Sequence, residues 1–222
     1  MLVSFSVGNY RSFKEPVTLS MEVETRLQGL EKSNFLPKED NQNLLNSAAI
    51  YGANASGKSN LIKAVRFMLN LIVHSAKDTQ QDEPIKIEPF LLDSTMANQP
   101  SFFEVVFLIE NIEYTYGFKA TKRKIAEEWL YYCPTKRKTI LFKREGQKYP
   151  TINKSHFKEG LGLQSRTREN ALFLSTAAQW NGPEAGKIIG ALKKSELSPA
   201  MIHNPFFTLQ RDFLNKTNIR TK

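Results

Sequence analysis

One stretch constrains the fold of this chain more than any other: Gly52-Ala53-Asn54-Ala55-Ser56-Gly57-Lys58-Ser59. It fits the pattern G-x-x-x-x-G-K-[ST] of a phosphate-binding loop. The two glycines allow the backbone to curl so that successive N–H groups point at phosphate oxygens. In such a loop the lysine, here Lys58, reaches the β- and γ-phosphates, and the hydroxyl of Ser59 coordinates Mg²⁺. A helix that follows directs the positive end of its dipole at the same phosphates.

The residues on either side of this stretch fit the motif. Residues 47–51 form a short apolar run that predicts a buried strand. After the motif, apolar residues recur at helical spacing to about His74, namely Leu61, Ile62, Ala64, Val65, Met68, Leu69 and Ile72. The alternative, a chance glycine turn, requires the motif and its strand–loop–helix context both to be accidental. The sequence therefore predicts a nucleotide-binding site at residues 52–59.

Alternating apolar residues predict strands elsewhere in the chain. Residues 3–7 and 17–23 alternate and are joined by a short polar link, which predicts an antiparallel pair. Residues 25–46 are mostly polar and predict a long loop. The stretch from about 101 to 145 predicts an antiparallel β meander, with turns at Glu110-Asn111 and Glu145-Gly146. Residues 171–175 predict another buried strand, and the pattern after Pro183 predicts a helix.

Composition bounds the cellular setting and the partners. The single cysteine, Cys133, excludes a disulfide framework and suits a reducing cytosol. No signal peptide or bilayer-spanning stretch is visible, so we expect a cytoplasmic protein without a membrane partner. The formal net charge of +9 suits a phosphate-bearing partner such as DNA or RNA. A solvated basic surface is the alternative, and charge alone does not decide between them. Three scattered histidines without nearby ligand residues give no support to a zinc site.

Several segments together resemble a known family. They are a strand ending in Asn9-Tyr10-Arg11-Ser12-Phe13, the loop with its following Asn60, the meander residues 114–118 and 128–132, and residues 172–175. They look like the ABC-type AAA-family ATPases of the SMC/RecF-like branch, which include bacterial phage-defence and retron-associated proteins. The resemblance covers Met1 to about Asn181. It implies an α/β P-loop NTPase fold, lobe I of an ABC-ATPase head, with a mixed core sheet and an antiparallel β subdomain. Lobe I would occupy residues 1–181, and a helical insertion or helical tail would begin in 182–222.

The resemblance also implies a site and its partners. ATP and Mg²⁺ are the implied cofactors, held between two heads of a homodimer or higher oligomer, with an effector protein such as a nuclease as a further partner. Gln179 would occupy the Q-loop position. There it would be a ligand of Mg²⁺ together with Ser59, and Gln179 and Lys58 would be the catalytic residues. A polar residue at a helix start is the alternative for Gln179, and a surface turn residue is the alternative for Arg11. If Arg11 contacts nucleotide, residues 9–13 must fold back beside the loop. The implied nucleotide contacts are Arg11, Ser12, Gly52, Asn54, Ala55, Ser56, Gly57, Lys58, Ser59 and Asn60.

The chain also departs from the family pattern. It contains no run of four apolar residues followed by Asp-Glu and no Leu-Ser-Gly-Gly signature. Without the acidic pair, the attacking water has no activating base and Mg²⁺ loses a supporting carboxylate. Two hypotheses follow: the chain is lobe I of a longer ATPase, or it is a non-hydrolysing regulatory module that uses nucleotide to hold a partner effector. The sequence leaves open whether ATP is hydrolysed.

Overall fold

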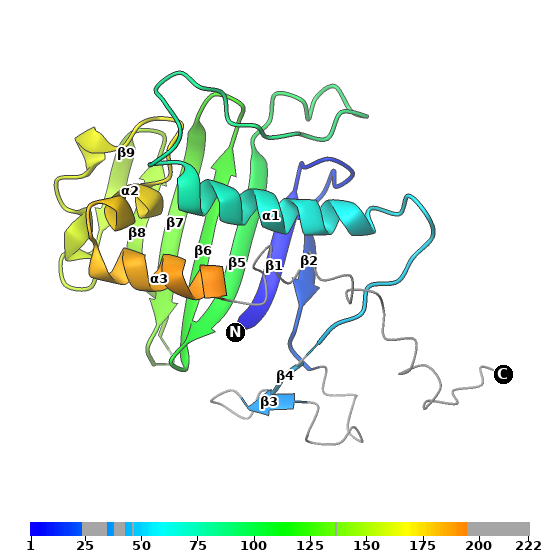
Figure 1. Ribbon diagram of the computed structural model, residues 1–222, viewed down its shortest axis with the longest axis horizontal. Helices are drawn as coiled ribbons and strands as arrows, with labels where there is room; N and C mark the ends of the chain where they lie inside the picture. Colours follow the sequence, from blue (N-terminus) through cyan, green and yellow to red (C-terminus); the bar gives the residue numbers. More distant parts are fainter. Residues whose placement is uncertain (24–34, 38–42, 46, 136, 195–222) are drawn as a thin grey trace.

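A single antiparallel sheet with helices on one face forms the body of the molecule (Figure 1). The computed structural model describes residues 1–23, 35–37, 43–45, 47–135 and 137–194. The sheet has seven strands in the order β2-β1-β5-β6-β7-β8-β9. They are β1 (Leu2–Gly8), β2 (Val17–Ser20), β5 (Ser101–Ile109), β6 (Ile112–Ala120), β7 (Ile125–Cys133), β8 (Thr139–Glu145) and β9 (Lys148–Ile152).

Among the described residues, three helices cover the sheet, and smaller elements lie at its margins. The helices are α1 (Lys58–His74), α2 (Phe173–Gln179) and α3 (Pro183–Lys194). Two short 3-10 helices, η3 (Lys158–Gly160) and η4 (Gln164–Arg166), precede α2. A separate two-stranded sheet pairs β3 (Phe35–Pro37) with β4 (Asn43–Leu45). Every described helix is too short or too polar to span a bilayer.

The predicted meander is confirmed. Strands β5 to β8 cover the predicted stretch and follow one another as antiparallel neighbours joined by short connections. Strand β9, which was not predicted, continues the meander beyond the turn at Glu145-Gly146. Glu110 and Asn111 both have positive φ, 52° and 64°, as the two-residue turn between β5 and β6 requires. The antiparallel pairing of β1 with β2 is also as predicted.

The core lies between the sheet and the helices. Alternate residues of β5, such as Phe103, Val105 and Phe107, are buried on the helix side. Helix α1 presents its apolar stripe to them, as the periodicity predicts, and its buried residues are Ala64, Val65, Met68, Leu69 and Ile72. Burial of each large side chain of this kind contributes about 1.5–3 kcal/mol. The core therefore fixes α1, and with it the loop from which α1 begins.

Three expectations about the sheet were wrong. Residues 47–51 form no strand, and Tyr51 is 62% exposed, because no described strand lies beside them to pair with their backbone groups. All described pairs in the seven-stranded sheet are antiparallel, so the expected mixed core sheet and separate β subdomain are one antiparallel sheet. The long loop predicted at 25–46 contains β3 and β4, and its other residues from 25 to 46 lie outside the described residues.

The fourth error concerns residues 171–175, which were expected to form a strand. They lead into helix α2, which begins at Phe173. Periodicity does not separate a short buried strand from a short buried helix. The predicted helix after Pro183 is confirmed as α3, which buries Ile188 and Leu192 in the same core. The division at residue 181 stays a prediction, and residues 195–222 lie outside the described part of the chain.

Candidate functional site

The predicted phosphate-binding loop, residues 52–59 (hereafter the P-loop), forms an exposed curl at the start of α1. Ala55 and Gly57 have positive φ of 63° and 94°, and Gly57 is the N-cap of the helix. The N–H of Ser56 donates to the carbonyl of Ala53, and the N–H groups of residues 60 and 61 donate to that of Gly57. Alternation of left- and right-handed residues is the backbone geometry of anion-binding nests. Residues 52–56 are exposed, so a ligand can reach them.

Both glycines of the motif are required by close contacts. A Cβ at Gly52 would lie 2.6 Å from Ser56 Oγ, and one at Gly57 would lie 2.9 Å from Ser12 Oγ. Gly57 also has the left-handed conformation that side chains other than glycine adopt at a cost. The two positions therefore need glycine for space, and the second needs it for backbone conformation as well.

Lys58 bends back over the P-loop. Its Nζ donates to the carbonyls of Gly52 and Ala53, both at 2.7 Å, and to Ser56 Oγ at 3.3 Å. The first turn of α1 contains no acidic residue, so nothing there offsets the ammonium charge or the helix dipole. Ser59 is exposed beside it. This set of N–H donors, one ammonium and one hydroxyl fits a nucleotide polyphosphate with Mg²⁺.

The connection between β1 and β2 lies beside the P-loop. We call residues 9–14 the N-terminal turn. The side-chain amide of Asn60 donates to Ser12 Oγ at 2.9 Å. A Cβ at Gly57 would also lie 3.6 Å from the ring of Phe13. The structure therefore brings the N-terminal turn back to the start of α1, as a nucleotide contact from this turn requires.

Arg11, in contrast, faces the segment that follows α1. Its Nη2 donates to the carboxylate of Glu88, its Nε donates to the hydroxyl of Tyr10 at 3.3 Å, and its backbone N–H donates to the carbonyl of Glu88. Ser12 is thus the residue of this turn that reaches the P-loop helix. The contact of Arg11 with nucleotide stays a prediction, and it requires the guanidinium to leave Glu88.

Asn9 fixes the other side of the N-terminal turn, and sequence reasoning missed it. Its side chain is buried, donates to the carbonyls of Met96 and Gln99 at 2.9 and 2.8 Å, and accepts from the N–H of Phe90. Its φ is 46°, a conformation that asparagine tolerates better than most residues. The Gly8-Asn9 pair signals a turn, but no spacing in the sequence identifies the carbonyls that its amide meets.

An ion pair ties the same turn to this segment. Lys14 Nζ lies 3.0 Å from Asp93, whose carboxylate also accepts hydrogen bonds from the hydroxyl and the N–H of Thr95. The Thr95 hydroxyl and then Lys14 lower the pKa of Asp93 from its ordinary 3.8 to about 2. The N-terminal turn is therefore held between the P-loop and residues 88–99.

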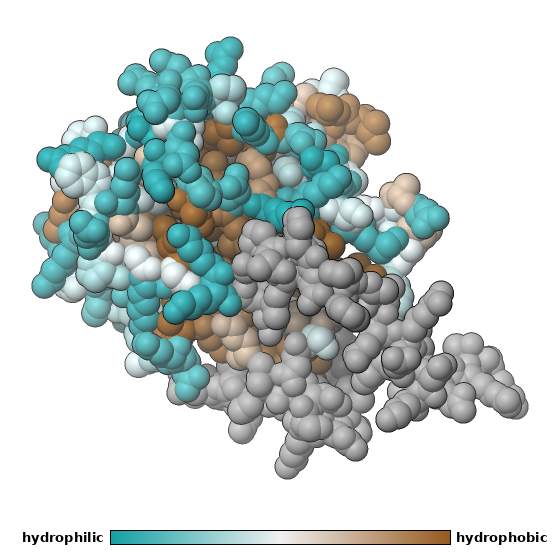
Figure 2. All heavy atoms as spheres, in the orientation of Figure 1, coloured by the Kyte–Doolittle hydropathy of each residue, from teal (hydrophilic) through white to brown (hydrophobic). Residues whose placement is uncertain are grey.

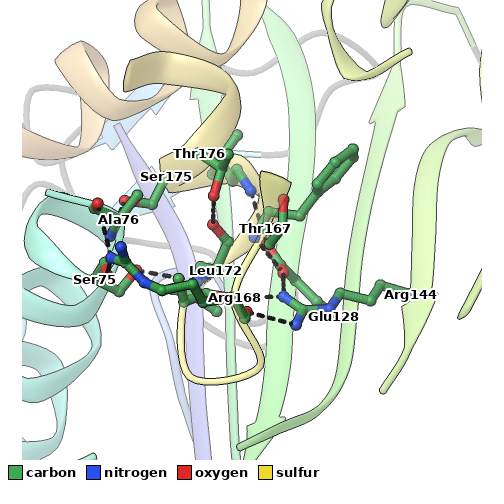
Figure 3. Close-up of polar contacts among 12 residues, drawn as sticks. Ser75, Ala76, Glu128, Arg144, Thr167, Arg168, Leu172, Ser175 and Thr176 are labelled. Atoms are coloured by element: carbon green, nitrogen blue, oxygen red, sulfur yellow. Dashed lines mark hydrogen bonds and ion pairs between the residues drawn. The ribbon is translucent and has the colours of Figure 1, made fainter. Parts of the chain in front are cut away.

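The structure does not bring Gln179 to the P-loop. Gln179 is the last residue of α2, not a residue that follows a strand. Helix α2 is attached to the C-terminal end of α1, where the N–H of Ala76 donates to Ser175 Oγ and that of Leu172 donates to Ser75 Oγ (Figure 3). The P-loop lies at the opposite end of α1, whose 17 residues span about 25 Å. The metal and catalytic roles of Gln179 stay predictions that this arrangement does not support.

A buried acid explains why α2 is a helix. The carboxylate of Glu128, on β7, accepts the N–H groups of Phe173 and Leu174 at 2.7 and 3.0 Å (Figure 3). These N–H groups belong to the first turn of a helix and have no partner within it. A negative charge there also complements the helix dipole. Glu128 thus specifies the start of α2 from 45 residues earlier in the chain.

Arg144 and Tyr116 complete this buried network. Arg144 Nη1 lies 3.4 Å from Glu128 and donates to the carbonyl of Ala171 at 2.6 Å, while the hydroxyl of Tyr116 donates to Glu128. Glu128 and Arg144 are each 1% exposed. Burial raises the pKa of Glu128, and the charge of Arg144 and the two N–H donors oppose this rise. The alternation of residues along β7 places Glu128 on the core face of the sheet, but the sequence does not show that its partners are Arg144 and the start of α2.

Residues 47–188 match the model of the family described as "AAA domain, putative AbiEii toxin, Type IV TA system". The match begins just before the P-loop and ends within α3. No curated protein matches the chain.

Proposed function

Because the chain belongs to this AAA-domain family, and so contains a P-loop NTPase-type domain, we propose that it binds ATP with Mg²⁺ through residues 52–59. The observation that carries the proposal is the position of Lys58. Its ammonium lies over an exposed loop with nest geometry, at a helix N-terminus without acidic residues. No described carboxylate neutralises this charge, so the site favours a polyanionic ligand.

Each group of the P-loop has a definite task in this proposal. The N–H groups of residues 55 and 57–59 hold the phosphate oxygens. Lys58 gives up its hydrogen bonds to the carbonyls of Gly52 and Ala53 and donates to the β- and γ-phosphates instead. Ser59 supplies a ligand to Mg²⁺, which neutralises charge on the phosphates. Asn60 follows the loop directly, and its side chain donates to Ser12 Oγ. Because Lys58 already has acceptors, binding replaces its hydrogen bonds and leaves no buried ammonium unpaired.

At the finer level, we propose an SMC/RecF-like head whose dimerisation is driven by ATP, within a nucleic-acid-linked or phage-defence complex. Residues 1–181 would form its lobe I, and an effector protein would be its partner. Two features support this. The N-terminal turn with its Asn-Tyr-Arg-Ser-Phe sequence lies beside the P-loop, and residues 50–56 are exposed around it. In a dimer of heads, a second copy would cover this exposed side of the nucleotide.

The second candidate function is a non-hydrolysing module in which ATP acts as a ligand that holds an effector. It is favoured by the sequence, in which no run of four apolar residues leads into an Asp-Glu pair, and by the surroundings of the site. Among the described residues, no carboxylate hydrogen-bonds Lys58 or Ser59. Hydrolysis therefore needs a general base from residues outside the described ones or from another chain.

Titration with a fluorescent ATP analogue tests the binding proposal. Lys58→Ala should lower the affinity about tenfold or more, because a charge-assisted hydrogen bond contributes roughly 1.5–3 kcal/mol. Lys63→Ala, which removes an exposed charge from the same helix, is the matched control and should bind as the parent does. Equal affinity of the parent and Lys58→Ala, with both chains folded, contradicts the assignment.

Phosphate release separates the two candidate functions. Turnover by the parent no faster than that of Lys58→Ala supports the ligand-holding module. Turnover clearly above that of Lys58→Ala supports an ATPase whose general base comes from residues outside the described ones or from another chain.

A further inference from the structure

A polar cavity lies at one end of the sheet, away from the P-loop. Its volume is about 440 Å³, and it is bounded by the β6–β7 turn, the β8–β9 turn and residues 165–170, which lead into α2. Both turns lie at the same end of the antiparallel meander (Figure 1). Hydrophilic residues gather over this end of the molecule (Figure 2). The lining includes three arginines, Arg123, Arg166 and Arg168.

Arg166 is held in place by an aromatic ring. Its guanidinium carbon lies 4.4 Å from the ring centroid of Trp180, a residue that is 55% exposed. A planar guanidinium stacked on an indole loses less freedom when it binds, because its orientation is already restricted. Such a plane can stack on a nucleobase or donate two parallel hydrogen bonds to a phosphate. Among the described residues, no ion pair engages Arg166 or Arg123.

Arg168 joins the cavity to the end of α1. Its Nη2 donates to the carbonyls of Ser75 and Ala76, at the helix C-terminus, at 3.3 and 3.0 Å (Figure 3). Its Nε is buried and has no hydrogen-bond partner among the described residues. A buried N–H donor without a partner is costly, so a ligand oxygen that reaches it would be favoured.

The same cavity also contains hydrogen-bond acceptors. Asp82 and Glu169 lie in its lining together with the amide of Gln147. Two carboxylates do not suit a ligand that is purely anionic. They suit one that carries N–H donors as well as a phosphate, such as a nucleobase attached to a nucleoside phosphate. A volume of about 440 Å³ is also in the range of small-molecule sites.

We propose that this cavity binds one nucleoside monophosphate unit, either a free nucleotide or a unit of a single strand. Arg123 and Arg168 face the phosphate, Arg166 stacks on the base with Trp180 behind it, and the carboxylates accept hydrogen bonds from the edge of the base. The site is separate from the P-loop, since α1, about 25 Å long, has the P-loop at one end and the Arg168 contacts at the other. The proposal does not depend on ATP binding at Lys58.

Two probes distinguish the sources of the nucleotide unit. One is a fluorescein-labelled 15-mer of deoxycytidylate, followed by anisotropy, and the other is free deoxycytidine monophosphate, followed by calorimetry. The amino group of cytosine supplies the N–H donors that the carboxylates accept. Neither probe has the β- and γ-phosphates that the P-loop binds. Binding of the 15-mer alone identifies a strand as the ligand, and binding of the monophosphate identifies a free nucleotide.

Substitutions then locate the binding. Arg166→Ala and Arg123→Ala should each lower the affinity for the bound probe about fivefold or more. Arg166→Lys should restore only part of the loss, because it keeps the charge without the stacking plane. For the 15-mer, each lost phosphate contact should also reduce the slope of log affinity against log salt by about 0.7.

Lys193→Ala, an exposed charge at the end of α3, is the matched control and should leave the affinity within about twofold. All variants should bind the fluorescent ATP analogue as the parent does. The proposal is overturned if neither probe binds the folded parent chain at low salt. It is also overturned if Lys193→Ala weakens binding as much as Arg166→Ala does, since general surface charge would then explain the affinity.

Discussion

The side-chain amide of Asn60 donates a 2.9 Å hydrogen bond to Ser12 Oγ, which joins the first turn of α1 to a turn 48 residues earlier in the chain. Ser12 Oγ is also the atom that a Cβ at Gly57 would approach to 2.9 Å. The P-loop is thus shaped on one side by a hydroxyl from the N-terminal turn. That turn is held in place on its other side by residues 88–99.

The hydrogen bond between Asn60 and Ser12 should appear as a coupling energy. Ser12→Ala, Asn60→Ala and the double variant form a cycle in the free energy of unfolding. We expect a coupling of about 0.5–1.5 kcal/mol, the usual net value of one hydrogen bond. Strictly additive effects of the two substitutions, measured by denaturant unfolding, would show that the contact contributes nothing to stability.

Gly57→Ala should destabilise the chain by about 1–3 kcal/mol, because φ of 94° is unfavourable for alanine and the new methyl meets Ser12 Oγ. Adding Ser12→Ala should recover part of the loss, since it removes the opposing atom. Gly190→Ala on α3 is the control: its Cβ meets nothing within 4 Å, and it should stabilise the helix by about 0.5–1 kcal/mol. If Gly57→Ala leaves the thermal unfolding midpoint unchanged, the left-handed conformation at residue 57 is not required.

Glu88→Gln should report on Arg11. The carboxylate of Glu88 now holds the guanidinium of Arg11, so its loss frees Arg11 to approach a nucleotide. We expect the affinity for the fluorescent ATP analogue to rise roughly threefold to tenfold. The rise should vanish in Arg11→Ala/Glu88→Gln, which separates release of Arg11 from simple removal of a negative charge. If Glu88→Gln binds the ATP analogue with unchanged affinity, Arg11 does not contact the nucleotide and serves only to hold residues 88–99.

Glu128→Gln should destabilise the chain by about 3–5 kcal/mol, the usual cost of leaving one member of a buried ion pair alone. The amide keeps the shape of the carboxylate but leaves Arg144 without a countercharge and weakens the hydrogen bonds to the start of α2. The neighbouring Glu127 pairs with Lys119 on the partly exposed face, so Glu127→Gln should cost under about 1 kcal/mol. Equal midpoints of the two variants in urea unfolding would contradict this difference.

The Lys14–Asp93 contact should be sensitive to acid. The pKa of Asp93 is lowered to about 2, so the folded state favours the charged carboxylate. Its contribution to stability is therefore present above about pH 4 and is lost as the pH falls through about 2. The difference in free energy of unfolding between the parent and Asp93→Asn should shrink as the pH falls from about 5 to 2. If the difference in free energy of unfolding stays constant across this pH range, the pKa of Asp93 is not lowered.

Some of this structure follows from local sequence alone. The glycines, Lys58 and Ser59 of the P-loop specify their chemistry within eight consecutive residues, and the apolar stripe of α1 follows from a spacing of three and four. The meander predicted from about 101 to 145 likewise follows from alternation and from the turns at Glu110-Asn111 and Glu145-Gly146, whereas β9 lies beyond that prediction. In each case the residues that determine the structure are close together in the chain, so the local sequence pattern is enough to predict it.

The rest was decided by contacts between distant residues. Only the tertiary structure shows that Ser12, rather than Arg11, touches the start of α1, because both are polar residues in one turn and packing alone selects between them. Residues 173–179 are helical because Glu128, on a distant strand, accepts their first N–H groups. Residues 47–51 are not a strand because no described neighbour pairs with them. Local periodicity has no information about such partners, since a buried polar group or a strand backbone is satisfied by whatever the fold places beside it.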